Sequence, residues 1–133
     1  MEKWNKKYKI FIVDDDKFLL DMYSIKFKEH GLEVTTFLSS QEALNQFENN
    51  NVSPDIILLD LVMPIMDGFE LLKKIRDNKL VQGARIVVLS NLGEQADIKK
   101  AEQYKIDGYI VKASATPSEV LDMVKGVLEK TQK

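Results

Sequence analysis

The chain has 133 residues, of which 44% are hydrophobic, and this is enough for one compact domain with a buried core. The formal net charge is −2 with acidic and basic residues interspersed, which argues against a protein that binds nucleic acid directly. There is no cysteine for a disulfide or a thiolate metal site, and no apolar run is long enough for a signal peptide or a membrane span, so we expect a cytoplasmic protein that does not insert into membranes.

The first part of the chain alternates strand and helix signals. Tyr8 to Val13 is rich in β-branched and aromatic residues and predicts a strand that ends at three aspartates, Asp14 to Asp16. Residues 17–29 predict a helix with two apolar stripes. The inward face consists of Leu19, Met22, Tyr23 and Phe27, and the second stripe of Phe18, Met22 and Ile25. A strand over residues 32–37 and a helix over residues 40–47 come next.

The stretch from residue 54 to residue 68 is the one around which we expect the fold to be organised. Ile56 to Leu59 is an unbroken apolar run, which is typical of a strand buried on both faces of a parallel sheet. The strand ends at Asp60, and in open α/β sheets ligand sites lie outside the carboxyl ends of the strands. Asp67-Gly68 then supplies a turn and an N-cap for a helix over residues 69–77.

Two more strands are expected, over residues 84–89 and 108–111, and they end at Ser90 and Lys112. Both strands are mainly apolar, as the central strand is. The carboxyl ends of these strands therefore carry a hydroxyl and an ammonium group.

The two remaining helices differ in how well they can be anchored. Gly93 to Tyr104 predicts a helix whose sizeable apolar residues are only Ile98 and Tyr104, so we expect it to be the least firmly held element and a candidate moving part. The final helix starts at Pro117. Its inward residues are Val120, Leu121, Val124, Val127 and Leu128, and a tail over Lys130–Lys133 is expected to follow.

Five strands that alternate with five helices through short connections predict an α/β fold, a doubly wound parallel sheet with right-handed crossovers and helices on both faces. With no linker or shift in composition, we expect a single domain over residues 1–133, with its core at about 8–129 and no output domain after it. The carboxyl ends of parallel strands meet at one edge of the sheet. The residues at that edge would be Asp14, Asp15, Asp60, Ser90 and Lys112.

This edge would hold several carboxylates within a few ångströms of one another. Each pair repels by roughly 4 kcal/mol at an effective dielectric constant of about 20, so the cluster needs a cation. Because only oxygen ligands are on offer, Mg²⁺ is the natural choice. The hydroxyl of Ser90 and the charge of Lys112 suit an anionic phosphoryl group, and Asp60 is placed to form an aspartyl phosphate.

Taken together and in this order, these motifs resemble the receiver domains of the two-component response regulators, over essentially the whole chain. The matching segments are Val13-Asp14-Asp15-Asp16, Asp60 with Met63-Pro64 and Asp67-Gly68, Ser90, and Tyr109-Ile110-Val111-Lys112. The resemblance implies a flavodoxin-like fold with strand order 2-1-3-4-5. It also implies a phosphorelay protein rather than an enzyme, whose only reactions are its own Mg²⁺-dependent phosphorylation and its autodephosphorylation.

The resemblance assigns a role to each residue of the cluster. Asp60 would accept a phosphoryl group from a phosphohistidine on a histidine kinase or a histidine phosphotransfer protein. Asp15, Asp60 and the backbone carbonyl of Val62 would bind Mg²⁺ directly, while Asp14 would act largely through water. Lys112 would pair with the phosphoryl group.

The resemblance also assigns the residues that pass the signal on. Ser90 would move to hydrogen-bond the phosphoryl group, and Tyr109 would turn inward behind it as an aromatic switch. The altered surface of the fourth helix, fifth strand and fifth helix, which includes Ile98 and Tyr109, would bind an unknown downstream protein. The phosphodonor would dock on the second stripe of the first helix, which consists of Phe18, Met22 and Ile25.

The chain departs from the family pattern at several positions. Ala113 stands where the family usually has a proline, often after a cis bond, and a cis bond before alanine would cost about 2.5–4 kcal/mol. Asn91 stands where a smaller residue commonly leaves room for the phosphoryl group. Val62 and Leu92 occupy positions that influence hydrolysis of the aspartyl phosphate. Because neither side chain can orient a water by hydrogen bonding, we expect slow autodephosphorylation.

Other interpretations stay open at this point. A phosphatase or phosphotransferase of the haloacid-dehalogenase kind also uses an aspartyl phosphate, although it normally has a second aspartate where this chain has Val62. A flavin or nucleotide site on the same fold would need a phosphate-binding loop, which does not follow the first strand. The intact cluster argues against a receiver that has lost phosphorylation, but Ala113 and Asn91 keep this alternative open. An active receiver could bind a target in trans, pass the phosphoryl group along a relay, or be a fragment of a longer regulator.

Overall fold

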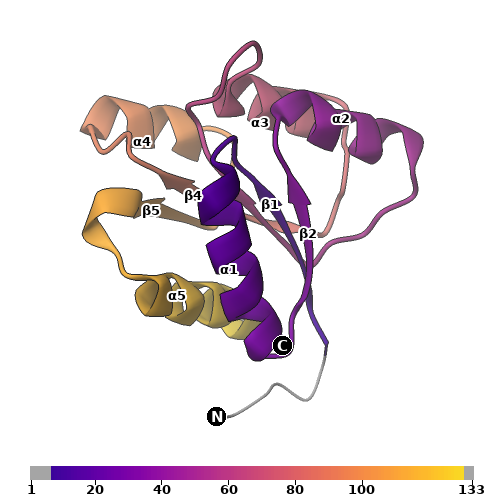
Figure 1. Cartoon of the computed structure of the whole chain (residues 1–133). Helices are drawn as coiled ribbons and strands as arrows, with labels where there is room; N and C mark the ends of the chain where they lie inside the picture. Colours follow the sequence, from indigo (N-terminus) through magenta and orange to yellow (C-terminus); the bar gives the residue numbers. More distant parts are fainter. Residues whose placement is uncertain (1–6, 131–133) are drawn as a thin grey trace.

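The computed structural model describes residues 7–130, which form a five-stranded sheet between two layers of helices (Figure 1). The strands are β1 (Lys9–Val13), β2 (Glu33–Phe37), β3 (Ile56–Leu59), β4 (Arg85–Ser90) and β5 (Gly108–Val111). The helices are α1 (Lys17–Glu29), α2 (Ser40–Asn49), α3 (Gly68–Asp77), α4 (Gln95–Glu102) and α5 (Pro117–Lys130), with a short 3₁₀ helix η1 (Lys112–Ser114) before α5.

The sheet is parallel throughout and its strand order is β2-β1-β3-β4-β5, which confirms the predicted fold class. Val13 of β1 pairs with Leu59 of β3, so the two strands end at the same level. Ser90 at the end of β4 pairs with Val111 at the end of β5. The residues that follow these strands therefore emerge together at one edge of the sheet.

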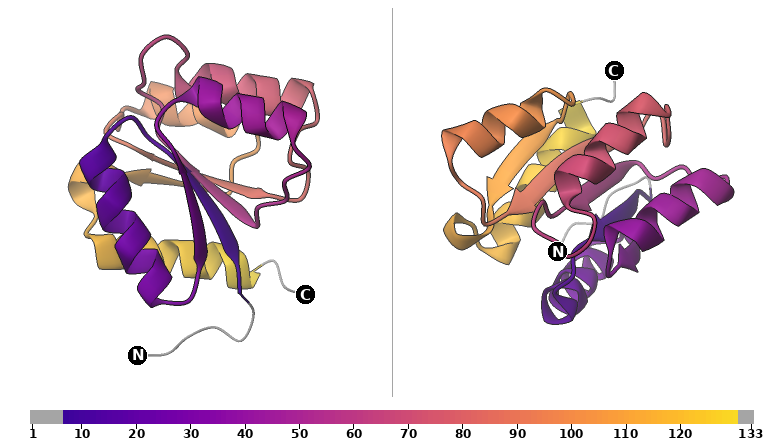
Figure 2. Two further views of the ribbon diagram at one scale, coloured as in Figure 1. Left: turned by 45° about the vertical axis from the view of Figure 1, so that its right-hand side comes forward. Right: turned by 90° about the horizontal axis from the view of Figure 1, so that it is seen from above.

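Each face of the sheet has its own apolar core. Figure 1 and Figure 2 show α1 and α5 on one face and α2, α3 and α4 on the other. Along β3 the side chains alternate between the two cores: Ile56 and Leu58 pack with α1 and α5, and Ile57 and Leu59 pack with the opposite layer. A strand with both faces covered needs apolar residues at every position, which explains the unbroken run in the sequence.

The rotation of α1 corrects one prediction. Its buried residues are Leu20, Tyr23 and Phe27, whereas Leu19 is only partly buried and Met22 is exposed. Leu20, Tyr23 and Phe27 have the i, i+3, i+7 spacing of one helical face, and that face meets the sheet. Met22 therefore belongs to the outer stripe alone.

The ends of two other helices also differ from the sequence-based expectation. α4 covers Gln95–Glu102 and is shorter than predicted, and α5 includes Lys130, which we expected in the tail; residues 131–133 of that predicted tail lie outside the described residues. α4 buries a single residue, Ala101, and its N-terminus has no side-chain hydrogen-bond cap. By contrast, the N-cap residue Asp67 of α3 accepts a backbone N–H with its side chain. α4 is thus held by few contacts, in agreement with its sparse apolar pattern.

Within residues 7–130, no helix combines the length and the apolar character that crossing a bilayer requires.

Candidate functional site

Asp60 directly follows β3 at the carboxyl edge of the sheet. Its backbone N–H donates to the carbonyl of Val13 at 3.0 Å, so the pairing of β3 with β1 continues up to this residue. The residue is buried, and its Oδ1 accepts the backbone N–H of Val62 at 3.2 Å. The strand and this turn together fix the direction in which the carboxylate points.

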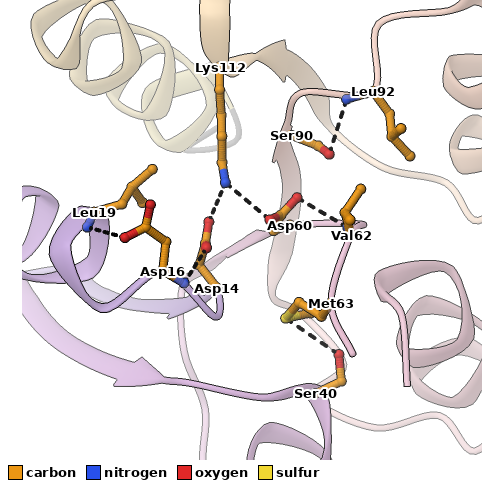
Figure 3. A network of polar contacts seen from close by, with 10 residues as sticks. All are labelled: Asp14, Asp16, Leu19, Ser40, Asp60, Val62, Met63, Ser90, Leu92 and Lys112. Atoms are coloured by element: carbon orange, nitrogen blue, oxygen red, sulfur yellow. Dashed lines mark hydrogen bonds and ion pairs between the residues drawn. The ribbon is translucent and has the colours of Figure 1, made fainter. Parts of the chain in front are cut away.

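Lys112 joins the two buried aspartates of this edge (Figure 3). Its Nζ lies 2.7 Å from Oδ2 of Asp14 and 3.1 Å from Oδ2 of Asp60. Burial disfavours the charged form of the lysine, but its hydrogen bond to Asp14 and the negative charges of Asp14 and Asp60 outweigh this and hold the pKa of its ammonium above the usual value. Lys112 is therefore a permanent positive charge in the site at neutral pH.

Three carboxylates gather around this lysine. Asp14, Asp15 and Asp60 each bring one oxygen within 4.8 Å of the others, with Asp15 exposed and the other two buried. Burial raises the pKa of the Asp14 carboxyl, and its hydrogen bond with Lys112 offsets this only in part. Three ionised carboxylates beside one ammonium leave two negative charges uncompensated, and a divalent cation that prefers oxygen ligands fits both this charge and this donor set. The cluster could therefore bind a metal ion.

Hydrogen bonds connect Ser90 to Tyr109 through the backbone of Leu92. Ser90 is fully buried at the end of β4, and its Oγ accepts the N–H of Leu92 at a long 3.4 Å. The carbonyl of Leu92 in turn accepts the hydroxyl of Tyr109 from β5. Burial, aided by the charges of Asp97 and Asp60, raises the pKa of this half-buried tyrosine above its ordinary value. A displacement of Ser90 would thus reach Tyr109 through one residue.

The loop between β3 and α3 is anchored along its length. The buried Met63 accepts the hydroxyl of Ser40 on its Sδ at 3.9 Å, which ties the loop to α2 (Figure 3). Gly68 donates its N–H to the carbonyl of Leu61 at 3.0 Å. A Cβ on Gly68 would lie 2.3 Å from the carbonyl oxygen of Asp60, so this position requires glycine.

The structure brings most of the predicted site residues together. Asp14, Asp15, Asp60 and Lys112 form one cluster, and Ser90 ends the neighbouring strand. Val62, a predicted metal ligand through its carbonyl, is two residues from Asp60 with 53% of its surface exposed.

The predicted partner-binding residues lie outside this cluster. Phe18 and Ile25 on α1 are 80% and 62% exposed, so this stripe is a surface feature and has no part in the core. Ile98 on α4 is half-buried, as is Tyr109 on β5. The two sets lie on opposite faces of the sheet.

Two neighbours of the site were missed from the sequence. Gly68 was interpreted only as part of a turn, although its backbone packs against that of Asp60. Tyr23 was assigned to the apolar face of α1, where it is buried. Burial raises the pKa of its hydroxyl; of the smaller effects, the charge of Lys112 lowers this pKa and the charge of Asp14 raises it. The sequence signal for Tyr23 was its hydroxyl, a polar group on an otherwise apolar helix face.

The structure shows the geometry at two of the departures from the family pattern, Ala113 and Asn91. The bond between Lys112 and Ala113 is trans, and the chain continues into η1. Asn91 is exposed beside the buried Ser90.

Comparisons with known proteins agree with this geometry. A family model described as the response regulator receiver domain matches residues 10–125. The probable transcriptional regulator ycf27 of Guillardia theta is 32% identical over 127 residues, which are 96% of this chain and 48% of that protein. Chemotaxis protein CheY of Halobacterium salinarum is 30% identical over 119 residues, which are 90% of this chain and 95% of that protein. The chain thus spans about half the length of a relative such as ycf27 and nearly the whole length of the chemotaxis protein.

Solved structures show the same likeness. The receiver domain of the Francisella response regulator 1452 superimposes with a TM-score of 0.83 and 28% sequence identity, and the match covers 95% of this chain and all of that one.

Proposed function

The chain belongs to the response regulator receiver domains, and from this membership we propose that it accepts a phosphoryl group on Asp60 from a phosphohistidine of a histidine kinase or a histidine phosphotransfer protein. The proposal is carried by the ion-paired edge of the sheet, where Lys112 contacts both Asp14 and Asp60. A carboxylate oxygen of Asp60 attacks phosphorus, so that a P–O bond forms and the P–N bond to the imidazole breaks. The imidazole keeps that electron pair and takes up a proton from solvent.

Two side chains are suited to hold the transferred group. The ammonium group of Lys112 contacts two carboxylates, so it is close enough to form a charge-assisted hydrogen bond to an oxygen of the incoming phosphoryl group. Ser90 holds the N–H of Leu92 only at 3.4 Å, so its hydroxyl can exchange this long contact for a short one to a phosphoryl oxygen.

The acidic cluster would hold Mg²⁺ through Asp15, Asp60 and the carbonyl of Val62, with Asp14 acting largely through water. When bound, the ion supplies positive charge that offsets the charge of the phosphoryl group and of the carboxylates. Asp14 and Lys112 remain paired beside it and keep Asp60 oriented.

We further propose that the signal leaves through α4, β5 and α5. Movement of Ser90 displaces Leu92, whose carbonyl accepts the Tyr109 hydroxyl. α4 follows directly and buries only Ala101, so little apolar contact opposes its shift. The surface that includes Ile98 and Tyr109 then differs between the two states, and a downstream protein that prefers one of them responds.

The partner that delivers the phosphoryl group would dock on α1 through Phe18, Met22 and Ile25, which are exposed. Such a donor obtains its phosphoryl group from ATP, which is found in the cytoplasm, so we propose a cytoplasmic location for the protein. Signalling is through proteins, with no direct contact to nucleic acid.

We expect the protein to catalyse no reaction of other molecules and to hydrolyse its own aspartyl phosphate slowly. Val62 is exposed and Leu92 partly buried, and both present hydrocarbon side chains that cannot orient a hydrolytic water. The aspartyl phosphate should therefore persist, and its loss within seconds would contradict this part of the proposal.

The test is intact-protein mass after incubation with Mg²⁺ and acetyl phosphate. The wild-type chain should gain one phosphoryl group, and chelation of the metal should prevent it. Asp60→Asn should gain none. Asp55→Asn is a matched control because Asp55 lies at the opposite end of β3, where it accepts the N–H of Lys9, and this variant should be phosphorylated normally.

Three outcomes would count against the proposal. Addition to Asp60→Asn would mean that another residue is the acceptor, and addition with the metal chelated would remove the role of the acidic cluster. If the wild-type chain gains nothing from acetyl phosphate or from a phosphorylated kinase, the chain is a receiver that has lost phosphorylation.

A further inference from the structure

The structure buries one polar side chain that the proposed function does not use. Apart from tyrosines, the buried polar side chains within residues 7–130 are those of Asp14, Asp60, Ser90 and Ser40. The first three lie at the carboxyl edge of the sheet, whereas Ser40 is the first residue of α2 and has 1% of its surface exposed. Its hydroxyl donates to Sδ of Met63 at 3.9 Å (Figure 3).

The stability of α2 does not explain why residue 40 is a serine. The N-cap of this helix is Ser39, whose hydroxyl already accepts the N–H of Glu42 at 3.1 Å. An alanine in place of Ser40 would occupy nearly the same space and would leave no hydroxyl to bury. Because a thioether sulfur is a weak acceptor, the contact with Met63 offsets the burial of the hydroxyl only in part. We therefore looked for a role of Ser40 in what it holds.

Met63 belongs to the loop between β3 and α3, and Ser40 connects this loop to α2. In the part of the chain that the structure describes, every other hydrogen bond of residues 61–67 has its partner within residues 60–71. Apolar packing also holds the loop, since Leu61 and Met63 are buried in the core beneath α2, α3 and α4. The hydroxyl of Ser40 thus adds the directional contact between the loop and the rest of the fold.

The peptide group between Val62 and Met63 connects this contact to the acidic cluster. A peptide group is planar, so the carbonyl of Val62 lies in one plane with the nitrogen and the Cα of Met63. On the other side of this plane, the N–H of Val62 donates to Oδ1 of Asp60 at 3.2 Å. Within residues 7–130 the carbonyl of Val62 itself accepts no hydrogen bond. The direction of this carbonyl therefore depends on how the residues at the two ends of the plane are held.

We propose that Ser40 is a positioning residue for the metal site: by holding Met63, it keeps the carbonyl of Val62 in the direction in which it can bind Mg²⁺ beside Asp60. The inference rests on the function proposed for Asp60 and extends the metal site to α2. Without the hydroxyl, the peptide plane after Val62 can rotate more freely, and the binding of the ion must then restrict this rotation. Ser40 should therefore act on the affinity for Mg²⁺ rather than on the transfer of the phosphoryl group.

The first test is an NMR titration of the isotope-labelled, unphosphorylated chain with MgCl₂. Ser40→Ala should raise the Kd for Mg²⁺ about fivefold, less than the roughly 10–100-fold effect of losing a group that hydrogen-bonds a metal ligand directly, because Ser40 acts through Met63. Ser39→Ala is the matched control, since it removes the cap of the same helix and lowers stability while the contact with Met63 stays in place. Its Kd should equal that of the wild-type chain. An unchanged Kd in Ser40→Ala, or an equal rise in both variants, would overturn the positioning role.

Met63→Leu tests the same contact from its other side. This substitution removes the sulfur acceptor at similar volume, so it should also raise the Kd for Mg²⁺. The double variant with Ser40→Ala should bind the ion about as well as Met63→Leu alone, because both changes remove one interaction. If the two effects add in full, the contact is not the cause and the inference is wrong.

The dependence of phosphorylation on Mg²⁺ separates affinity from reaction. With acetyl phosphate as donor, the Mg²⁺ concentration that gives half the maximal rate should rise in Ser40→Ala by the same factor as the Kd. The maximal rate at saturating Mg²⁺ should change by less than about twofold. A lower maximal rate with an unchanged half-saturating concentration would contradict the assigned role.

The outcomes also distinguish this inference from the function on which it rests. If the wild-type chain neither binds Mg²⁺ nor gains a phosphoryl group, the function proposed for Asp60 fails and the role of Ser40 fails with it. If the wild-type chain binds Mg²⁺ and is phosphorylated on Asp60 while Ser40→Ala binds the ion equally well, only the role of Ser40 is overturned.

Discussion

Substitution of Gly68 by alanine tests the close contact between the start of α3 and the end of β3. The added Cβ would lie 2.3 Å from the carbonyl oxygen of Asp60 and 2.7 Å from the Cα of Leu61. Both atoms belong to the backbone, so no side-chain rotation can relieve the overlap. Because ordinary contact begins at 3.4 Å, either α3 or the backbone at Asp60 must move by about 1 Å.

The free energy of this change can be estimated from three contributions. Overpacking of this kind costs about 1–3 kcal/mol. Weakening the hydrogen bond from Gly68 to the carbonyl of Leu61 costs about 1 kcal/mol more. Alanine is a better helix former than glycine by about 1 kcal/mol, which acts in the opposite direction, although less so at the first position of a helix. Gly68→Ala should therefore destabilise the protein by about 1–3 kcal/mol in total.

Gly126→Ala provides the control, because a Cβ at Gly126 in α5 meets nothing within 4 Å. There the helix propensity acts alone, and we expect stabilisation by about 1 kcal/mol. Urea unfolding followed by circular dichroism measures both variants, and intact mass after acetyl phosphate treatment measures how far Asp60 has been displaced. Gly68→Ala should be phosphorylated more slowly and Gly126→Ala at the wild-type rate. If both variants are stabilised and phosphorylated equally well, the contact does not position Asp60 and the reasoning is wrong.

Three further perturbations address α4, α2 and the switch tyrosine. Arg76 donates from its Nε to the carbonyl of Tyr104 at 2.7 Å and from its Nη2 to the carbonyl of Lys105 at 2.9 Å, so Arg76→Ala should destabilise the end of α4 by about 1–2 kcal/mol. Hydrogen exchange of the α4 amides should then accelerate, and unchanged exchange would show that these two hydrogen bonds do not stabilise the helix. Ser39→Ala removes the N-cap of α2 and should lower the free energy of unfolding in urea by about 1 kcal/mol, whereas Ser39→Thr should restore most of it. The pKa of Tyr109 is raised in the folded protein above its ordinary value of 10.0. Between the pKa of the unfolded chain and that of the folded protein, the unfolded chain binds fewer protons, so the free energy of unfolding falls as the pH rises through this window. Unfolding curves recorded on both sides of that window should show a shallower decline for Tyr109→Phe, and identical slopes would refute the shift.

The sheet edge could be predicted because the sequence carries a separate signal for each of its parts. An unbroken apolar run such as Ile56–Leu59 has few alternatives to a strand buried on both faces. The acid that follows such a strand lies at the carboxyl end of the strand. Because β1 and β3 pair in parallel and end at the same level, the acids after the two strands lie at the same edge of the sheet. The fold class and the edge therefore followed from local patterns combined with one topological rule, whereas the strand order 2-1-3-4-5 came from the resemblance to the receiver domains.

The features that were missed depend on contacts between elements. Apolar residues occupy most sides of α1, so the pattern alone does not fix its rotation, and packing against the sheet and α5 selects the face with Leu20. No turn propensity predicts positive φ at Ile65, because the conformation follows from anchors on both sides of it. The contact of Gly68 with Asp60 is equally invisible from the sequence, since a glycine after an aspartate is already explained as a turn.

The division of the core by the sheet has a consequence for how such a chain can evolve. The proposed donor-docking stripe is on α1, which packs in one core, and α4 packs in the other, with a strand layer buried on both faces between them. Residues on opposite sides of that layer share no side-chain contacts within their cores, so substitutions on the two sides should be nearly additive in their effects on stability. A lineage could then exchange its input partner by drift on α1 while the part of its output surface on α4 is retained, and the reverse. The strand-end residues, and α5, which packs beside α1 in the same core, stay under both constraints.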